Sequence, residues 1–296
     1  MTVQALISLP GNESTGAALA QQLNVQLLVP EVRAFPDGET YFRLDADLRA
    51  LSTAIVCTLD RPDTKLMRLL VAVDNLRHRG ASCVGLVAPY LAYMRQDTSF
   101  HPGEAVSARA FGAVLSQHFD WIVTVDPHLH RIRSLSEVFR MPSRAVHCAD
   151  LIAEWIASNV REPILIGPDS ESMQWVREVA AKAGAPYLVL QKVRRGDRDV
   201  VISLPDMQRW HEHTPVLVDD IISTGLTMNA TLRQLQSAKM RPAACVGVHA
   251  IFAAGAIESL RTFRPTHIVT TNTITHSTNA IDVSRLVADG IRSIAG

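Results

Sequence analysis

The 296-residue chain contains no Gly-Lys pair, so it has no Gly-x-x-x-x-Gly-Lys phosphate loop, and it has no Gly-x-Gly-x-x-Gly segment either. These absences exclude the two familiar glycine-rich nucleotide loops, so any nucleotide must bind by other means. An excess of charge is also missing, because 29 basic residues balance 29 acidic ones and no basic tract occurs. We therefore expect neither nucleic acid nor a membrane surface as a partner.

Long apolar runs and clustered cysteines are absent as well. No apolar stretch approaches the ~20 residues that a membrane-spanning helix needs, and the amino terminus lacks a charged region followed by a long apolar one. The four cysteines, Cys57, Cys83, Cys148 and Cys245, are widely spaced, and three of them lie inside apolar runs. We expect small core residues and not metal ligands or disulfides. The expected location is the cytoplasm.

Short apolar runs alternate with helix-like segments along the whole chain. This alternation predicts parallel β-α-β units and an α/β fold, and strands that are apolar without alternation predict a sheet with both faces covered. The predicted strands are 5–9, 53–58, 83–88, 121–125, 164–167, 186–190, 216–218, 245–251 and 267–271. The predicted helices are 16–23, 64–79, 107–118, 148–158 and 172–183.

Two pairs of segments resemble each other and occur in the same order. ASCVGLV at 81–87 matches AACVGVH at 243–249, and WIVTVD at 121–126 matches HIVTTN at 267–272. We infer two copies of one α/β domain, 1–145 and 146–296. Leu59-Asp60 would then take the place of Asp219-Asp220, followed by a segment without glycine. The first copy would have lost a loop that the second keeps, which leaves it free to hold a second substrate.

That loop follows the apolar run 216–218, where Asp219-Asp220 precede the small-residue turn Ser223-Thr224-Gly225 and a helical run from Met228. Such a turn directs backbone N–H groups and the positive end of a helix dipole at one point, which suits a phosphate. The carboxylates suit sugar hydroxyls, a metal ion, or both. The loop therefore predicts a site for a phosphorylated sugar, and a solvated turn with a capped helix is the alternative.

Two polar segments in the first half are further candidates. FPDGE at 35–39 has the turn chemistry of a hairpin, and we expect a hairpin in which Phe35 stacks on a base while Asp37 and Glu39 accept from an exocyclic amine. A hairpin without a binding role is the simpler interpretation. Arg95-Gln-Asp97 follows a predicted strand, and the carboxyl ends of strands are where open α/β sheets bind ligands.

Metal and phosphate chemistry is expected at three more places. His128 follows Asp126-Pro127 after a strand, and Asp169 follows Gly167-Pro168 in the second half. The two could share Mg²⁺, which takes few protein ligands and completes its shell with phosphates and water, although a structural histidine is the alternative. Residues 192–199 (KVRRGDRD) have the composition of a solvated loop. A mobile loop with Lys and Arg also suits closure over a polyphosphate.

Taken together, these segments and the closing stretches TTNTI at 270–274 and IDVS at 281–284 resemble the ribose-phosphate pyrophosphokinase family over essentially the whole chain. The resemblance implies two tandem type I phosphoribosyltransferase-like domains. It also implies Mg²⁺-dependent transfer of the β,γ-diphosphoryl group of ATP to the 1-hydroxyl of ribose 5-phosphate, which gives 5-phosphoribosyl 1-diphosphate and AMP for nucleotide biosynthesis.

The resemblance also implies a role for each candidate residue. Ribose 5-phosphate would be held by Asp219, Asp220, Ser223, Thr224, Gly225, Leu226 and Thr227. ATP would be contacted by Arg95, Gln96 and His128, with its adenine reached by Phe35, Asp37 and Glu39 from a neighbouring subunit. The shared adenine site implies a homo-oligomer, at least a dimer. His128 and Asp169 would hold Mg²⁺, and Lys192 and Arg194 would stabilise the transition state.

Several positions depart from the usual pattern of the family. Ser223 and Leu226 stand where Asp and Gly are usual, Thr98 stands in place of an arginine, and Ser170-Glu-Ser172 replaces Ala-Gly-Gly. The serine form is closer to the archaeal branch. The alternatives are a phosphoribosyltransferase, a non-catalytic regulatory paralogue, and a pyrophosphokinase acting on a larger ribose 5-phosphate derivative. Because Lys192, Arg194, His128 and Asp169 are all present, we expect an active enzyme.

Overall fold

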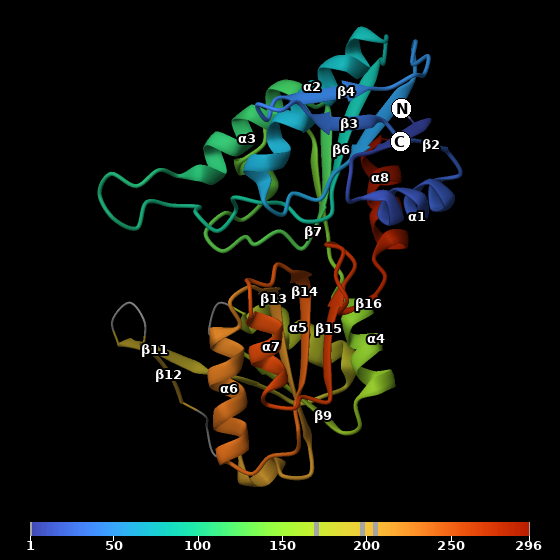
Figure 1. Cartoon of the computed structure of the whole chain (residues 1–296). Helices are drawn as coiled ribbons and strands as arrows, with labels where there is room; N and C mark the ends of the chain where they lie inside the picture. Colours follow the sequence, from blue (N-terminus) through green and yellow to red (C-terminus); the bar gives the residue numbers. More distant parts are fainter. Residues whose placement is uncertain (1, 169–171, 196–198, 204–206, 296) are drawn as a thin grey trace. The chain divides into compact units, whose positions relative to one another are not determined.

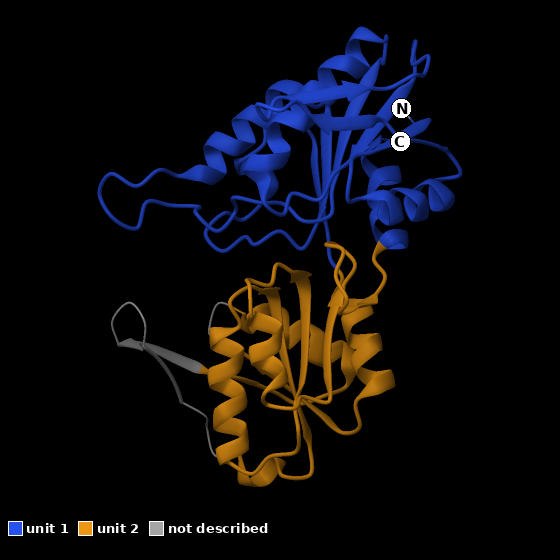
Figure 2. Cartoon of the chain, viewed as in Figure 1, with its two compact units in different colours: residues 1–147, 284–296 blue, residues 148–283 orange. Residues whose placement is uncertain are grey.

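A computed structural model gives the fold (Figure 1). It describes residues 2–168, 172–195, 199–203 and 207–295, with only the backbone of 191–195 and 199–203. Asp169 lies outside the described residues, as do the side chains of Lys192 and Arg194. The chain divides into two compact units (Figure 2), the first made of Met1–His147 with Ser284–Gly296 and the second of Cys148–Val283.

The first unit is built on a six-stranded sheet in the order β2-β1-β5-β6-β7-β8, with every pair parallel. Its strands are β1 (Ala5–Ser8), β2 (Gln26–Leu28), β5 (Ser52–Val56), β6 (Cys83–Ala88), β7 (Trp121–Val125) and β8 (Ser143–Val146). Its helices are α1 (Glu13–Leu23), α2 (Pro62–His78), α3 (Ser107–His118) and α8 (Ser284–Ala295), with a short 3₁₀ turn at Leu135–Glu137. An antiparallel hairpin, β3 (Glu31–Ala34) and β4 (Thr40–Arg43), stands apart from the sheet.

The second unit repeats this plan with a six-stranded parallel sheet in the order β10-β9-β13-β14-β15-β16. Its strands are β9 (Pro163–Gly167), β10 (Tyr187–Val189), β13 (Thr214–Ile222), β14 (Ala244–Ala250), β15 (His267–Thr271) and β16 (Asn279–Ile281). Its helices are α4 (Ala149–Asn159), α5 (Met173–Ala183), α6 (Leu226–Ser237) and α7 (Ala256–Arg261), with a 3₁₀ turn at Gln208–Trp210. The same order of strands in both sheets confirms the predicted α/β fold with two related, mostly parallel sheets.

The segment expected to be a solvated loop is instead a two-stranded antiparallel ribbon, β11 (Gln191–Arg195) and β12 (Asp199–Ser203). The backbone register places Lys192 opposite Ile202 and Arg194 opposite Val200. The interpretation from composition failed because it weighed the charged residues 192–199 alone. The β-branched run Val200-Val201-Ile202 that follows has high strand propensity and supplies the pairing partner.

The central strands are buried along their full length, which explains their continuous apolar sequences. All residues of β5, β6 and β7 are buried, as parallel strands covered on both faces require. The four cysteines are free and buried, so they are core residues as predicted. In the part of the chain that the structure describes, no helix is long and apolar enough to cross a bilayer.

The last helix, α8, follows the second unit in sequence but belongs to the first compact unit. An apolar stripe that includes Val287, Ala288 and Ile291 buries one side of α8, and the helix packs on β7 and β8 of the first unit. A Cβ at Gly290 would lie 2.7 Å from Val146 Cγ1, so the glycine permits this close approach. The second domain was expected to run from 146 to 296, whereas its compact unit ends at Val283.

Strand registers revise the expected correspondence between the two copies. In the first sheet, Gly85 lies between Ala54 on β5 and Trp121 on β7. In the second sheet, Ala244 lies between Val216 on β13 and His267 on β15. If Trp121 corresponds to His267, then Cys57 and Thr58 correspond to Asp219 and Asp220. Matching Gly85 with Gly247 instead places Ala54 at Asp219. Neither register supports the expected equivalence of Leu59-Asp60, because sequence similarity ignores the different lengths of the connections.

Candidate functional site

The paired carboxylates lie within β13 and not beyond its end. The sequence predicted that this strand stops at Val218, but pairing with β14 continues to Ile222 opposite Ala250. The strand continues beyond the two aspartates because the apolar Ile221 and Ile222 that follow them are buried. Asp219 and Asp220 are half-buried neighbours on one strand, so their side chains point to opposite faces of the sheet.

A tight turn, residues 223–225, connects β13 to the N-terminus of α6. Gly225 is the N-cap residue and has φ 70°, in the left-handed region that glycine adopts without strain. The space that a side chain at position 225 would enter is open, since a Cβ there would meet nothing closer than 3.7 Å. Backbone conformation therefore explains the glycine. The turn leaves the N-terminus of a 12-residue helix at residues 224–227, with Leu226 63% exposed.

Hydrogen bonds with the segment that follows β14 stabilise this turn. The Ala253 amide donates to the Ser223 carbonyl at 3.1 Å, and Asn229 Nδ2 donates to Ser259 Oγ of α7 at 2.9 Å. The Asn229 amide donates to the Gly225 carbonyl at 2.7 Å. These bonds fix the turn before any ligand arrives, and such preorganisation favours anion binding at a helix N-terminus.

The predicted FPDGE hairpin is present as β3 and β4. The Phe35 amide donates to the Glu39 carbonyl at 2.8 Å, and the Glu39 amide donates to Asp37 Oδ1 at 3.2 Å. The Phe35 ring is 41% exposed and meets Tyr41 edge to face at 6.0 Å between centroids. The Arg33 guanidinium lies over both rings, 4.0 Å from Tyr41 and 5.0 Å from Phe35. The hairpin thus presents an aromatic ring with a cation beside it, a surface that suits a flat base.

The connection from β6 to α3 carries Arg95 and Gln96. Arg95 is exposed, and Gln96 Nε2 donates to the Thr98 carbonyl at 3.1 Å and to Glu104 Oε2 at 3.3 Å. Glu104 also accepts from the amides of Phe100 and His101. The hydrogen bond from the His101 side chain, followed by those two amides, lowers the pKa of Glu104 to about 2. The carboxylate therefore stays ionised and organises this loop.

A buried carboxylate joins this loop to the one after β7, and the sequence analysis assigned it no role. Asp97 Oδ2 accepts from the Arg131 amide at 2.9 Å, and Oδ1 accepts from Arg131 Nη1 at 3.2 Å. The Asp97 side chain is only 2% exposed. Burial acts to raise the pKa of Asp97, but the hydrogen bonds and charge of Arg131 outweigh it and leave the pKa below its usual value. The segments with Gln96 and His128 are thereby tied together.

His128 follows β7 as predicted and meets a second histidine. The Nε2 atoms of His128 and His130 are 2.7 Å apart, with the rings perpendicular. Nearby, the buried Asp126 accepts from His147 Nδ1 at 2.7 Å and has φ 33°, unusual for a residue with a side chain. The sequence alone gave no sign of the contact between His128 and His130 or of the Asp126–His147 pair.

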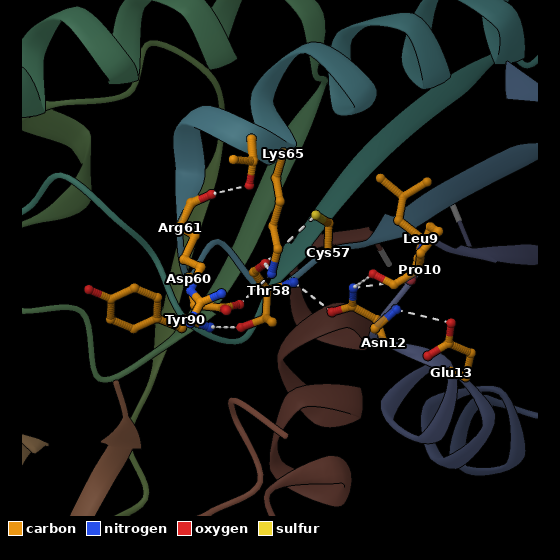
Figure 3. A network of polar contacts seen from close by, with 12 residues as sticks. Leu9, Pro10, Asn12, Glu13, Cys57, Thr58, Asp60, Arg61, Lys65 and Tyr90 are labelled. Carbon is orange, nitrogen blue, oxygen red and sulfur yellow. Dashed lines mark hydrogen bonds and ion pairs between the residues drawn. The ribbon is translucent and has the colours of Figure 1, made fainter. Parts of the chain in front are cut away.

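The turn after β5 in the first unit is closed by side chains of the same unit (Figure 3). Asn12 Oδ1 accepts from the Thr58 amide at 2.7 Å, and Lys65 Nζ donates to the Thr58 carbonyl at 2.9 Å and also pairs with Asp60. The Tyr90 amide donates to Thr58 Oγ1 at 3.2 Å. The lysine charge is therefore met by protein oxygens, and this turn is closed by contacts within the unit.

The candidate residues are distributed over both units. The hairpin, Arg95, Gln96 and His128 belong to the first unit, and the Asp219–Thr227 loop belongs to the second. Among the described residues, no group of three or more His, Cys, Asp or Glu side chains is placed to hold a metal ion. The available donors, a few carboxylates and imidazoles, fit an ion whose shell is completed by substrate oxygens and water.

Comparison with known proteins agrees with this geometry. A family model described as the phosphoribosyl transferase domain matches residues 134–286, and one described as the N-terminal domain of ribose phosphate pyrophosphokinase matches residues 4–118. The structure aligns with phosphoribosylpyrophosphate synthetase from Mycobacterium smegmatis over 99% of both chains, with a TM-score of 0.86 and 22% identity. The fold and the β13–α6 loop thus define a protein with two tandem phosphoribosyltransferase-like domains.

Sequence relatives narrow the class to one family. The ribose-phosphate pyrophosphokinase of Methanopyrus kandleri is 33% identical, with 95% of this chain and 96% of that protein covered. The ribose-phosphate pyrophosphokinase of Saccharolobus solfataricus is 31% identical, with 96% and 99% covered. The chain belongs to the ribose-phosphate pyrophosphokinase family, an enzyme family, and its similarity to archaeal members confirms the resemblance noted from the sequence.

Proposed function

We propose that the chain transfers the diphosphoryl group of ATP to the 1-hydroxyl of ribose 5-phosphate. The observation that carries this proposal is the β13–α6 loop, where Asp219 and Asp220 precede a preformed turn at the N-terminus of a 12-residue helix. The loop amides and helix dipole suit the 5-phosphate, and the carboxylates suit the ribose hydroxyls. Ser223, Thr224 and Thr227 supply hydroxyls around the turn.

The first unit would hold the nucleotide. Arg95, Gln96 and His128 lie on the two connections that follow β6 and β7, at the carboxyl edge of the sheet where such folds bind ligands. Phe35, with Asp37 and Glu39, lies on the exposed hairpin. We propose that this hairpin reaches the adenine held by a neighbouring subunit, which makes the active form a homo-oligomer. An active monomer in sedimentation would refute the shared site.

The reaction is a displacement at phosphorus. The oxygen of the 1-hydroxyl forms a bond to the β-phosphorus, the bond from that phosphorus to the oxygen bridging the α-phosphorus breaks, AMP leaves, and the hydroxyl proton is released. Positioning and charge neutralisation carry most of the catalysis in such transfers. We assign the neutralising role to Lys192 and Arg194 on the β11–β12 ribbon, because cations there suit the charge that develops on the transferred group.

We propose Mg²⁺ as the metal of the proposed reaction, in line with the expectation from the sequence. When bound, a divalent ion bridges phosphate oxygens and offsets their charge. His128 and Asp169, the latter outside the described residues, are the proposed protein ligands. We also propose a cytoplasmic location. The four cysteines are free and buried, as is usual in a reducing compartment.

Incubation with Mg-ATP and ribose 5-phosphate tests the proposal through the release of AMP. We expect AMP to form only when both substrates are present. Asp219→Asn should raise the KM for ribose 5-phosphate, and Phe35→Ala should raise the KM for ATP. Tyr187→Ala is a matched control, because this ring is exposed at the far edge strand β10 and should leave both constants unchanged. Folded protein that forms no AMP with any of several divalent metals would refute the function.

A further inference from the structure

Two imidazoles face each other on the connection after β7. His128 Nε2 and His130 Nε2 lie 2.7 Å apart, the ring centroids are 4.0 Å apart, and the rings stand at 88° to each other. At this distance one nitrogen donates the single shared hydrogen and the other accepts it through its lone pair. If each neutral ring carries its hydrogen on Nδ1, two Nε2 lone pairs are directed at one small region between the rings.

We propose that His128 and His130 form a two-histidine site for a divalent transition metal ion of the cobalt, nickel or zinc class. Neutral imidazole nitrogen is a common ligand for these ions. His130 is exposed and His128 is half-buried, so the pair lies near solvent. The residues are two apart on an irregular segment, which allows both rings to approach the same ion.

The observed distance suits chelation after a small adjustment. Bonds of about 2.0–2.1 Å from zinc to imidazole nitrogen place two nitrogens about 3.3 Å apart around a tetrahedral ion and about 2.9 Å apart around an octahedral one. The two Nε2 atoms, now 2.7 Å apart, would separate by only a few tenths of an ångström. Rotations of two side chains on a surface connection can supply this movement without a change in the sheet.

The second histidine changes which metal is favoured. Magnesium prefers oxygen ligands in near-ideal octahedral geometry, whereas affinity at sites with nitrogen ligands rises from manganese toward cobalt, nickel and copper. No larger cluster of protein ligands occurs in the described parts of the chain. The remaining positions around the ion would be filled by water, and by phosphate oxygens when a nucleotide is present. Only this last point rests on the proposed function.

Cobalt(II) titration of the tag-free protein without nucleotide tests the site. Nitrogen ligation of Co²⁺ gives visible absorption bands that differ from those of the hydrated ion. We expect saturable bands with one equivalent of Co²⁺ in the wild type. His130→Gln and His128→Gln should each weaken binding at least ~10-fold, as loss of even an outer contact to a ligand can do. His78→Gln is the control, because this exposed histidine lies on α2 and pairs with Asp74 of the same helix.

The two histidine variants also separate this inference from the proposed function. If His130→Gln binds Co²⁺ with wild-type affinity and spectrum, the two-histidine site is wrong, whatever the enzyme does with ATP. If the Co²⁺ bands depend on both histidines while no AMP forms with any metal, the site stands and the proposed function fails. Thermal unfolding of each variant should match that of the wild type, because His130 is exposed and His128 is only half-buried.

Discussion

Replacing Asp97 tests how the connections after β6 and β7 are held together. The carboxylate is 2% exposed and accepts two hydrogen bonds from Arg131, whose own side chain is 50% exposed. Hydrogen bonds to a charged group contribute about 1.5–3 kcal/mol, and leaving a donor without its acceptor costs about 1–3 kcal/mol. Because solvent screens the half-exposed guanidinium, we expect Asp97→Ala to lower the free energy of unfolding by about 2–3 kcal/mol. Asp97→Asn keeps one acceptor and should cost about 1 kcal/mol.

The dependence on pH follows from the lowered pKa of Asp97. A carboxyl group whose pKa is lower in the folded state stabilises the fold above its unfolded pKa of ~3.9, and this contribution disappears as the pH falls through the folded pKa. The difference in unfolding free energy between the wild type and Asp97→Asn should therefore be constant near neutral pH and shrink below about pH 4. Urea unfolding at pH 7 and at pH 3.5 measures it.

The same substitution should affect one substrate and not the other. Asp97 connects the segment carrying Gln96 to the segment carrying His128, so its loss should raise the KM for ATP while the KM for ribose 5-phosphate stays unchanged. Asp74→Asn is the matched control, because that carboxylate is 72% exposed on α2. A stability difference that does not vary with pH, or an equal rise in both KM values, would show that the Asp97–Arg131 pair does not have the role assigned to it.

Three further changes probe other parts of the account. Asn12→Ala removes the buried acceptor of the Thr58 amide and should lower the unfolding free energy by about 1–3 kcal/mol in urea titration; an unchanged midpoint would contradict this. Gly225→Ala forces a Cβ into φ 70°, so we expect a loss of about 1 kcal/mol and a higher KM for ribose 5-phosphate alone. Lys192→Ala should reduce turnover by several orders of magnitude while calorimetry shows unchanged ribose 5-phosphate binding; equal losses would assign the ribbon another role.

Much of the fold follows from the sequence because the buried strands are continuous apolar runs. The bounds of β6, β7, β15 and α3 coincide with the predicted ranges 83–88, 121–125, 267–271 and 107–118. The short edge strands β2, β8 and β16 were not predicted, because three or four half-exposed residues carry little periodic signal. Helix α8 is strongly amphipathic, yet its return to the first unit depends on long-range packing that no local pattern reveals.

The candidate site was predictable where chemistry is local. The turn at Ser223–Gly225 and the hairpin around Phe35 are encoded by residues adjacent in sequence, and both are present. Contacts between distant segments were not predictable. Asp97 and Arg131 are 34 residues apart, and nothing in either segment alone indicates that the carboxylate is buried against that arginine. Even the contact between His128 and His130 depends on the irregular path of the chain after β7 and not on their spacing alone.

The central claim is that the β- and γ-phosphoryl groups of ATP move together onto ribose 5-phosphate. Phosphorus NMR of the reaction mixture with Mg²⁺ tests it directly, because AMP and a sugar diphosphate have resonances distinct from those of ATP and ADP. We predict that AMP and 5-phosphoribosyl 1-diphosphate appear in equal amounts and that none of either forms when ribose 5-phosphate is left out. Formation of ADP with a singly phosphorylated sugar, or no consumption of ATP by folded protein, would contradict the account.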